Sequence, residues 1–425
     1  MFLFYTILYS LFIATFRIFS FTHPRIKVFF QIRKSKPDFQ ALKRRTKKGR
    51  DLYWFHASSV GEYEQARAVA CVLKEKKKNC FIFFTVFSDS AYYQRKDDQI
   101  HDAFFALPFD FPFVMKKWIS QLNPAAIFYA RYDVWPNMAR TAKQMDVPQY
   151  LISAAVTKTS SRWKGISALF HRKVYSFLTK IYTMDLNSAS FLQEQNLPAQ
   201  FAGDTRYDAV VEKLQKEPVS ISRWKKDLEK WIKKAEYSLL AGSTYPTSEK
   251  MILQWMKENS DRKVILVPHH VNQNHSDEIR QLAAKLKIPT LFFSQWQKKT
   301  GSIPEKTRLI VIDETGILPY LYSLSMVAYV GGGFEGSVHS LLEPLASLAT
   351  ILTGPAFQNA PEANVLKQKG FLFSVEKPDS DCFHTAFKKA MRVANNNRIP
   401  MEEFLKSNLG ASRKIVEDVL GQGIE

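Results

Sequence analysis

The feature that most constrains the fold of this chain is the regular alternation of buried strand-like runs with amphipathic helical segments. In the first half, helical patterns such as residues 111–122 and 134–145 separate runs rich in aliphatic and aromatic residues. Such alternation predicts a parallel sheet with helices on both faces, because parallel neighbours need a crossover between them. The strand-like runs of this first series are residues 53–58, 80–88, 125–131, 149–156 and 180–185.

A second alternating series predicts a second domain of the same kind. The charged stretch between the two series, residues 211–235, has no strand-like run and is expected to connect the domains. We therefore expect an α/β chain with two doubly wound Rossmann-like domains facing a cleft, where ligands bind at the carboxyl ends of the strands. The strand-like runs of the second series are residues 237–244, 263–270, 290–295, 308–313, 326–333, 349–355 and 371–375.

The chain begins with an uncharged apolar run, residues 1–16, that is followed by a basic block. Sixteen residues are slightly short of the ~20 that span a bilayer, but including residues 17–21, with Arg17 snorkelling, makes a span feasible. A signal peptide is disfavoured because no basic residue precedes the run and no small-x-small cleavage site follows it. We expect a retained membrane anchor, either spanning or lying in the interface, with the rest on the cytoplasmic side.

The net charge of +20 indicates an anionic partner. From Arg17 to Arg50 the chain has twelve Lys or Arg residues against one acid, Asp38. Because this charge lies beside the apolar run and not on a known nucleic-acid module, it favours acidic lipids over nucleic acid. The expected layout is an anchor at 1–22, a basic collar at 23–50, an N-terminal domain at 51–210, the connection at 211–235, a C-terminal domain at 236–400 and a C-terminal helix at 401–425.

Glu62 is the first candidate for chemistry. It follows Gly61 in the turn between a buried strand and a helix whose inner face we expect to carry Ala66, Val69, Ala70 and Leu73. An acid in a first helical turn is also favoured by the helix dipole alone, so a structural role stands beside the functional one. A carboxylate held at a strand edge, with a glycine beside it, suits a general base that accepts a proton from a substrate hydroxyl.

The second candidate is the stretch 329–355, where a buried strand runs into three glycines. Glycines followed by a helix start suit phosphate binding, and His339 and Glu343 are expected to share one helix face, four residues apart. The stretch is neither a Walker loop nor a GxGxxG fingerprint, and a plain strand–loop–helix crossover remains the alternative. The residues concerned are Gly331, Gly332, Gly333, Ser337, His339, Ser340 and Glu343.

Three polar stretches follow other strands: residues 203–208, 241–249 and 267–270. Arg206 is the best candidate for neutralising a phosphate leaving group. A metal site is not expected, because the neighbouring histidines lack supporting acids or cysteines, and His269 and His270 should point to opposite sides of a strand end. The three cysteines show no metal-ligand spacing either.

With these residues in place, the chain resembles the 3-deoxy-D-manno-octulosonic acid (Kdo) transferases of glycosyltransferase family 30 over nearly its whole length. The similarity is carried by short motifs in a fixed order. They are HASSVGE, DVWPN, GDTRYD, GSTYPTSE, LVPHH, GGGFEGSVHSLLEPLA and TGPAFQNAPEANVL.

This resemblance implies a GT-B architecture and an inverting transfer, without a metal or other cofactor, at the cytoplasmic face of the inner membrane. It implies CMP-Kdo as donor and a phosphorylated lipid A precursor as acceptor, with Glu62 as general base. The donor site it implies comprises Arg206, Ser243, Thr244, His270, Gly331, Gly332, Gly333, His339, Glu343 and Asn359, and the acceptor side comprises Ser58, Ser59, Gly61 and Arg131.

The chain departs from the family pattern at several positions. Arg131 stands where many relatives have an acid, and Ala155 and His269 stand where arginine is common. Tyr245 replaces a frequent histidine, and the segment after the glycines is one residue shorter. The alternatives are a sugar-nucleotide epimerase or another membrane-associated glycosyltransferase, an inactive lipid-binding protein, and a nucleic-acid binder.

Overall fold

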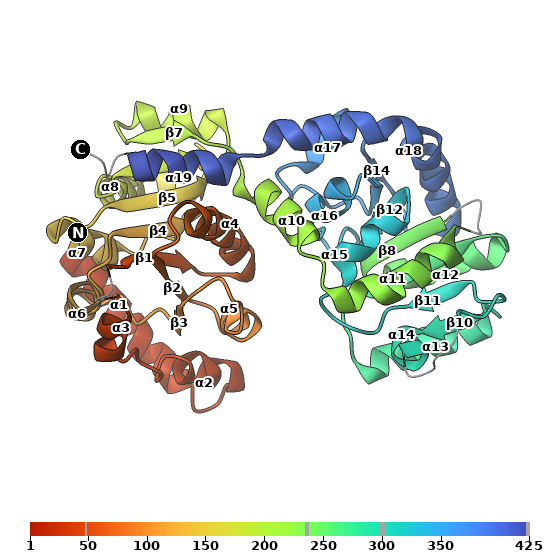
Figure 1. Cartoon of the computed structure of the whole chain (residues 1–425), viewed down its shortest axis with the longest axis horizontal. Helices are drawn as coiled ribbons and strands as arrows, with labels where there is room; N and C mark the ends of the chain where they lie inside the picture. Colours follow the sequence, from red (N-terminus) through yellow and green to blue (C-terminus); the bar gives the residue numbers. More distant parts are fainter. Residues whose placement is uncertain (47–48, 234–237, 298–301, 422–425) are drawn as a thin grey trace. The chain divides into compact units, whose positions relative to one another are not determined.

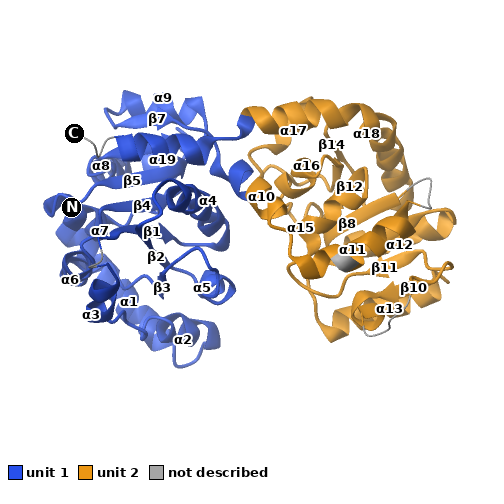
Figure 2. Cartoon of the chain, viewed as in Figure 1, with its two compact units in different colours: residues 1–209, 408–425 blue, residues 210–407 orange. Residues whose placement is uncertain are grey.

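The computed structural model describes residues 1–46, 49–233, 238–297 and 302–421. Parts of the expected collar, connection and C-terminal helix, namely residues 47–48, 234–237 and 422–425, lie outside the described residues. The chain divides into two compact units (Figure 2): unit 1 comprises residues 1–209 and 408–425, and unit 2 comprises residues 210–407.

Unit 1 is built on a parallel sheet of seven strands in the order β3-β2-β1-β4-β5-β6-β7 (Figure 1). All five predicted strands are present, and two short strands, β3 and β7, were not predicted. The strands are β1 (Asp51–Ala57), β2 (Cys80–Val86), β3 (Ala103–Ala106), β4 (Ala126–Ala130), β5 (Gln149–Ala154), β6 (Lys180–Thr183) and β7 (Ala199–Phe201).

Helices alternate with the strands of this sheet, and the N-terminal segment before β1 is also helical. The described helices of unit 1 are α1 (Phe2–Phe19), α2 (Pro24–Gln31), α3 (Phe39–Thr46), α4 (Val60–Lys76), α5 (Asp89–Arg95), α6 (Pro112–Leu122), α7 (Pro136–Gln144), the 3₁₀ turn η1 (Ser161–Trp163), α8 (Gly165–Tyr175), α9 (Leu186–Glu194), α10 (Thr205–Gln215), which runs into unit 2, and α19 (Ala411–Gly421). By length and composition, α1 is apolar enough to cross a membrane, and only 6% of it is buried.

Unit 2 has its own parallel sheet of seven strands, in the order β10-β11-β9-β8-β12-β13-β14. Each of the seven runs predicted for this half forms a strand. They are β8 (Ser238–Thr244), β9 (Lys263–Pro268), β10 (Thr290–Phe292), β11 (Leu309–Val311), β12 (Val327–Val330), β13 (Thr350–Thr353) and β14 (Leu372–Ser374). The described helices are α11 (Val219–Ile232), α12 (Pro246–Glu258), α13 (Gln273–Lys285), α14 (Phe293–Gln297), α15 (Leu318–Leu321), the 3₁₀ turn η2 (Tyr322–Leu324), α16 (Leu342–Ala346), α17 (Ala363–Gln368) and α18 (Ser380–Asn408).

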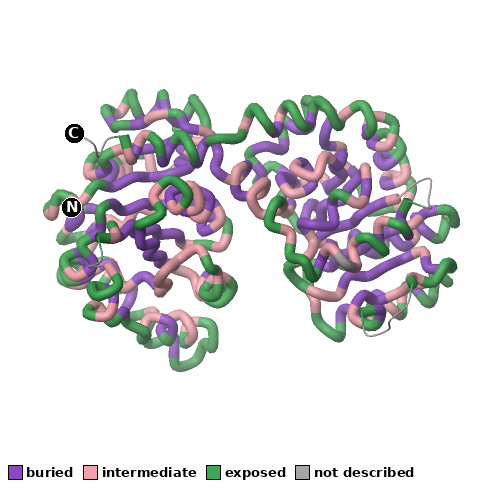
Figure 3. Tube along the Cα trace, viewed as in Figure 1, coloured by how far each residue is buried: buried purple, intermediate pink, exposed green. Residues whose placement is uncertain are grey.

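The strands read as unbroken apolar runs because both faces of each sheet are covered (Figure 3). In unit 1, Trp54 lies opposite Phe83 of β2 and packs towards α6, whereas Phe55 packs on the other face beneath α4. The predicted inner face of α4 is confirmed, since Ala66, Val69, Ala70 and Leu73 are all fully buried.

The segments at the domain ends are more integrated than their sequence suggests. Within the expected connection, residues 211–233 are largely helical, and α11 contributes Leu228, Trp231 and Ile232 to a core cluster of unit 2. In the C-terminal segment, α19 packs against α4 of unit 1 and buries Ile415 and Val416 there.

Two positions follow from these strand orders. In unit 1 the chain changes direction across the sheet between the neighbours β1 and β4, and in unit 2 it does so between β8 and β12. Ligands of doubly wound sheets bind outside the carboxyl ends of the strands at such switch points. The segments after β1, β4, β8 and β12 are therefore the places to look for a site.

Candidate active site

The first of these segments is the turn between β1 and α4, which fixes Glu62 through a capping box. Ser59 is the N-cap residue, and its hydroxyl accepts the backbone N–H of Glu62 at 3.3 Å. The Glu62 oxygen Oε2 accepts the backbone N–H groups of Ser58 at 2.9 Å and Ser59 at 3.0 Å. Such reciprocal bonds satisfy amides that a helix start otherwise leaves unpaired. The serine and glutamate three residues apart are the sequence signature of this box, which our sequence reading missed.

The Glu62 carboxyl is buried, with 5% of the residue exposed. Burial, together with the charge of the nearby Asp133 carboxyl, raises its pKa from 4.5 to about 6. The two backbone N–H bonds act in the opposite direction, because they stabilise the ionised form. The result is a carboxyl group that exchanges its proton near neutral pH.

Asp133 reaches this turn because β4 lies beside β1 in the sheet. It is in the segment after β4, and the residues that follow it attach that segment to the end of β1. The indole N–H of Trp135 donates to Nε2 of His56 at 2.9 Å, and the His56 Nδ1 lies 3.1 Å from the Thr85 carbonyl oxygen. Burial lowers the His56 pKa to about 3, so this imidazole is a neutral structural link. Sequence reasoning did not identify Asp133 as a partner of Glu62.

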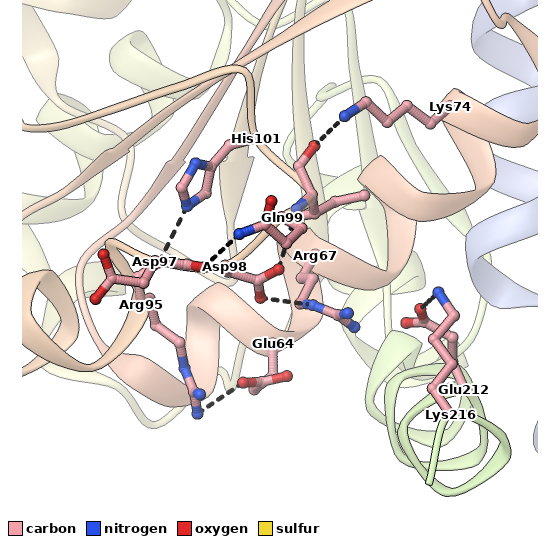
Figure 4. Close-up of polar contacts among 11 residues, drawn as sticks. Glu64, Arg67, Lys74, Arg95, Asp97, Asp98, Gln99, His101, Glu212 and Lys216 are labelled. Atoms are coloured by element: carbon pink, nitrogen blue, oxygen red, sulfur yellow. Dashed lines mark hydrogen bonds and ion pairs between the residues drawn. The ribbon is translucent and has the colours of Figure 1, made fainter. Parts of the chain in front are cut away.

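The opposite side of α4 carries partly exposed charged residues (Figure 4). Glu64 forms an ion pair with Arg95 at 2.8 Å, and Arg67 forms one with Asp98 at 2.9 Å. These pairs lie on a different side of α4 from Glu62. Glu64 is therefore a matched control for any substitution of Glu62.

The candidates on the acceptor side lie around this turn. Ser58 and Ser59 act through their amides on Glu62, as described above. A Cβ built on Gly61 meets no described atom within 4 Å, so packing does not require a glycine there and the space beside it is open. Arg131 has a positive φ of 66°, and its guanidinium lies 5.2 Å from the Tyr132 ring.

Arg206, the candidate for the leaving phosphate, lies at the start of α10 in unit 1. Its Nε and Nη2 donate to Oδ2 of Asp204 at 2.9 and 2.7 Å. The same motif also supports the fold: Thr205 bonds to the Ser153 hydroxyl at 2.7 Å, and Asp208 accepts the N–H groups of Gly410 and Ser412 at the start of α19, each at 2.7 Å.

In unit 2, the ends of β8 and β12 approach each other closely. A Cβ on Gly331 would lie 1.9 Å from the carbonyl oxygen of Ser243, and a Cβ on Gly333 would lie 2.7 Å from the backbone of Gly354. Ser243, near the end of β8, has a positive φ of 52°, at an irregularity in the pairing of β8 with β9. The glycines are thus needed for backbone packing between loops, whatever ligand these loops bind.

Four rings gather above these strand ends. The Tyr245 hydroxyl is 3.1 Å from Nε2 of His339, and the His269 ring stacks on those of Tyr245 and His339 at centroid distances of 4.9 and 4.3 Å. The His270 ring lies 5.6 Å from that of Tyr245. Burial, with the charges of the other two histidines, lowers the His339 pKa to about 4, so His339 is neutral at pH 7. Sequence reasoning did not predict Tyr245 as the partner of His339.

Two expectations for this region are wrong. Helix α16 begins only at Leu342, so His339 precedes it and does not share a helix face with Glu343. Instead, Glu343 pairs with Lys213 at 3.2 Å. The strand β9 ends at Pro268, and the rings of His269 and His270 lie 4.7 Å apart and do not point to opposite sides.

The remaining donor candidates are held by neighbouring groups. Asn359 bonds to both backbone groups of Val338, at 3.0 and 2.9 Å, and so fixes the loop that carries His339. The Thr244 hydroxyl donates to the buried Glu249 at 2.9 Å, and His275 bonds to the same oxygen at 3.0 Å. Within the described part of the chain, no group of three or more His, Cys, Asp or Glu side chains is arranged to hold a metal ion.

Comparison with known proteins relates this geometry to a family. Residues 33–209 match the model of the 3-deoxy-D-manno-octulosonic-acid transferase (kdotransferase) family. A probable mitochondrial 3-deoxy-D-manno-octulosonic acid transferase of Arabidopsis thaliana is 28% identical over 321 residues, covering 71% of this chain and 68% of that protein. The chain is a relative of the Kdo transferases. A 3-deoxy-D-manno-octulosonic acid transferase of Haemophilus influenzae extends the similarity, being 26% identical over 388 residues, or 86% of this chain and 85% of that protein.

A solved structure supports the fold. The UDP-GlcNAc 2-epimerase of Neisseria meningitidis, bound to UDP-GlcNAc, superposes with a TM-score of 0.60 and 15% identity, covering 88% of this chain and all of that one. At this identity the likeness concerns the fold alone. The predicted GT-B type with two doubly wound Rossmann-like domains is confirmed, and so is the resemblance to the Kdo transferases drawn from the sequence motifs.

Proposed function

We propose that this protein is an inverting glycosyltransferase that moves Kdo from CMP-Kdo onto a phosphorylated lipid A precursor. The observation that carries the proposal is the Glu62 carboxyl. It is buried at the switch point of the unit 1 sheet, has a raised pKa, and lies inside the region that matches the Kdo transferase model.

The environment of Glu62 suits a general base. Its Oε2 already accepts hydrogen bonds from two backbone N–H groups, so Oε1 is the oxygen that takes up the proton. A carboxylate with a pKa of about 6 is ionised at pH 7 yet more basic than an exposed one. In the proposed reaction, Glu62 takes the proton of an acceptor hydroxyl as its oxygen bonds to the anomeric carbon of Kdo. The bond from that carbon to the phosphate oxygen breaks, and its electron pair leaves with CMP.

The donor is assigned to the unit 2 loops, where the carboxyl ends of β8 and β12 carry the candidate residues. The rigid Gly331–Gly333 turn, Ser243 and Thr244 are proposed to bind the phosphate and sugar. The neutral His339, held by Tyr245, can donate or accept a hydrogen bond without adding charge. His270, Glu343, Asn359 and Arg206 complete the proposed donor set, with Ser58, Ser59, Gly61 and Arg131 on the acceptor side.

We further propose that the transfer needs no metal and takes place at the cytoplasmic face of an inner membrane, where the acceptor lipid resides. The apolar α1 and the basic residues that follow it support this location. The experiment is incubation of the purified full chain with CMP-Kdo and a phosphorylated lipid A precursor, with mass spectrometry of the lipid. A Kdo-sized mass increase that survives a chelator is expected; no increase would refute the function, and loss on chelation would refute the metal-free step.

A pH profile tests the coupling between the two carboxyl groups. In an Asp133→Asn variant the neighbouring negative charge is gone, so the Glu62 pKa falls from its value of about 6. The base then stays ionised to lower pH, and we expect the acid limb of the kcat/KM profile to move down by about one pH unit or less. If the acid limb did not move, the charge of Asp133 would have no effect on the pKa of the catalytic base.

A further inference from the structure

Helix α1 is attached to unit 1 along one face by polar contacts. The Tyr5 hydroxyl donates to Oδ2 of Asp110 at 3.0 Å, and the Asn137 side-chain amide donates to the Thr6 hydroxyl at 3.0 Å. Asp110 is fully buried, and the same oxygen accepts the backbone N–H of Asn137 at 2.9 Å. A polar group of α1 therefore completes the hydrogen bonding of a buried carboxyl group in the body of the unit.

The opposite face of α1 is apolar and exposed. Its hydroxyl groups do not need water, because Ser10 donates to the Thr6 carbonyl at 2.7 Å and Thr15 donates to the Leu11 carbonyl at 2.9 Å. This face can therefore enter hydrocarbon without leaving these donors unpaired. Its large side chains are Leu3, Phe4, Ile7, Leu8, Leu11 and Phe12.

Helix α8 extends this apolar surface on one side. Ile166 is 82% exposed and Leu169 is 60% exposed. The next residue, Phe170, packs its ring against those of Phe2 and Tyr5 at 5.5 and 5.7 Å, so this part of α8 lies directly beside α1. Two large apolar side chains from a separate element thus adjoin the exposed face.

Helix α6 does the same on another side of α1. Phe113 is 74% exposed and stacks on Phe111 at 5.9 Å, and the Phe111 ring contacts that of Tyr9 at 5.7 Å. The apolar surface is therefore composed of three helices that are distant in sequence.

The helices that form and flank this surface, α1, α2, α6, α7 and α8, carry lysine and arginine residues but no acidic ones. At the start of α1 there is an open cavity of about 470 Å³. Its apolar lining is Met1, Phe2, Leu3 and Phe177, and its cations are Arg140, Lys143 and Lys173. An apolar floor with a cationic rim matches the acyl chains and phosphates of anionic lipids.

We propose that α1 lies in the plane of the membrane and does not cross it. In this arrangement the outer face of α1, together with Ile166, Leu169 and Phe113, enters one leaflet that contains anionic phospholipid, and the surrounding lysines and arginines contact its phosphates. This inference rests on the membrane location in the proposed function but not on Kdo transfer. Vesicle binding can therefore fail while the transfer assay succeeds.

The attachment to unit 1 is the reason that α1 does not span. With 18 residues the helix is about 27 Å long, close to the thickness of the hydrocarbon core. To stand across it, α1 would have to leave unit 1, and the Tyr5 bond to the buried Asp110 would be lost. Lying flat keeps these contacts and adds the apolar residues of α6 and α8 to the membrane surface.

The test is binding of the purified full chain to phosphatidylethanolamine vesicles with and without phosphatidylglycerol. The informative variant is Ile166→Glu with Leu169→Glu, because α8 contacts lipid only if α1 lies flat. The matched control is Val219→Glu with Ile399→Glu in unit 2, where the two residues are similarly exposed, 88% and 68%. Thermal unfolding of each protein verifies its fold.

We expect the α8 variant to lower the vesicle-bound to free ratio by about tenfold or more and the control to leave it within twofold. We also expect phosphatidylglycerol to strengthen wild-type binding, and Arg140→Gln with Lys173→Gln to remove much of that gain. Unchanged vesicle binding by the α8 variant would overturn the proposal. So would a dimer in detergent that the α8 variant dissociates while vesicle binding persists, because this surface would then belong to a second copy.

Discussion

A Glu62→Gln variant will transfer Kdo about 10²–10⁴-fold more slowly than the wild type while remaining folded. Glutamine keeps the shape of the side chain, and its carbonyl oxygen can still accept the N–H groups of Ser58 and Ser59. It cannot accept the proton of the acceptor hydroxyl. The substitution therefore separates the base from the helix cap, which removal of the side chain would not.

The same variant should be more stable at neutral pH. The folded-state pKa of Glu62 is raised from 4.5 to about 6, so the folded protein binds this proton more tightly and loses stability as pH rises through that window. Glutamine has no such dependence. We expect it to gain about 1–2 kcal/mol over the wild type at pH 8, falling towards zero at pH 4.5. Denaturant unfolding at the two pH values measures this difference.

The control is Glu64→Gln, which removes a partly exposed carboxylate from another side of the same helix. It should change transfer by no more than about twofold, since its partner is a surface arginine. If Glu62→Gln also turned over at close to the wild-type rate, the glutamate would be a capping residue only, and the base would have to be sought elsewhere.

The second large effect is expected from Gly331→Ala. The added Cβ would lie 1.9 Å from the Ser243 carbonyl oxygen and 3.1 Å from the Thr244 Cα, so backbone atoms of β8 would have to move. The two strands are paired at this point, Val330 with Gly242, which limits that movement. We expect a loss of about 3 kcal/mol or more in unfolding free energy, or about 6 °C or more in the midpoint measured by calorimetry.

Gly61→Ala is the matched comparison for stability. A Cβ there meets no described atom within 4 Å and the position lies in the first turn of α4, so stability should be unchanged or slightly higher. A drop in transfer without a drop in stability would indicate that a ligand approaches Gly61. Equal midpoints for the wild type and Gly331→Ala would mean that the backbone at Ser243 relaxes easily, contrary to the packing described.

The sequence was sufficient for the architecture and for the position of Glu62, because these depend on local periodicity. All the longer strands and the inner face of α4 could be predicted from their apolar patterns. The strands β3 and β7, of four and three residues, were not predicted, although the three-residue strands β10, β11 and β14 were, because these three lie within longer strand-like runs. The capping box was readable from Ser59 and Glu62.

The partners of the site residues could not be predicted in the same way. Asp133 comes close to Glu62 only because β4 lies next to β1, and strand order is a long-range property. The contact between Tyr245 and His339 likewise joins segments 94 residues apart. Short polar stretches after strands indicate where a site lies, but which of them meet depends on the sheet.

The packing of α19 on α4 has a practical consequence for dissecting this enzyme. The polypeptide passes between the two units twice, so a fragment that stops at residue 209 would lack Ile415 and Val416. The apolar residues of unit 1 that pack against these two side chains would then be exposed to water. Such a fragment should be insoluble unless residues 408–425 are supplied as a separate peptide or joined to it by circular permutation.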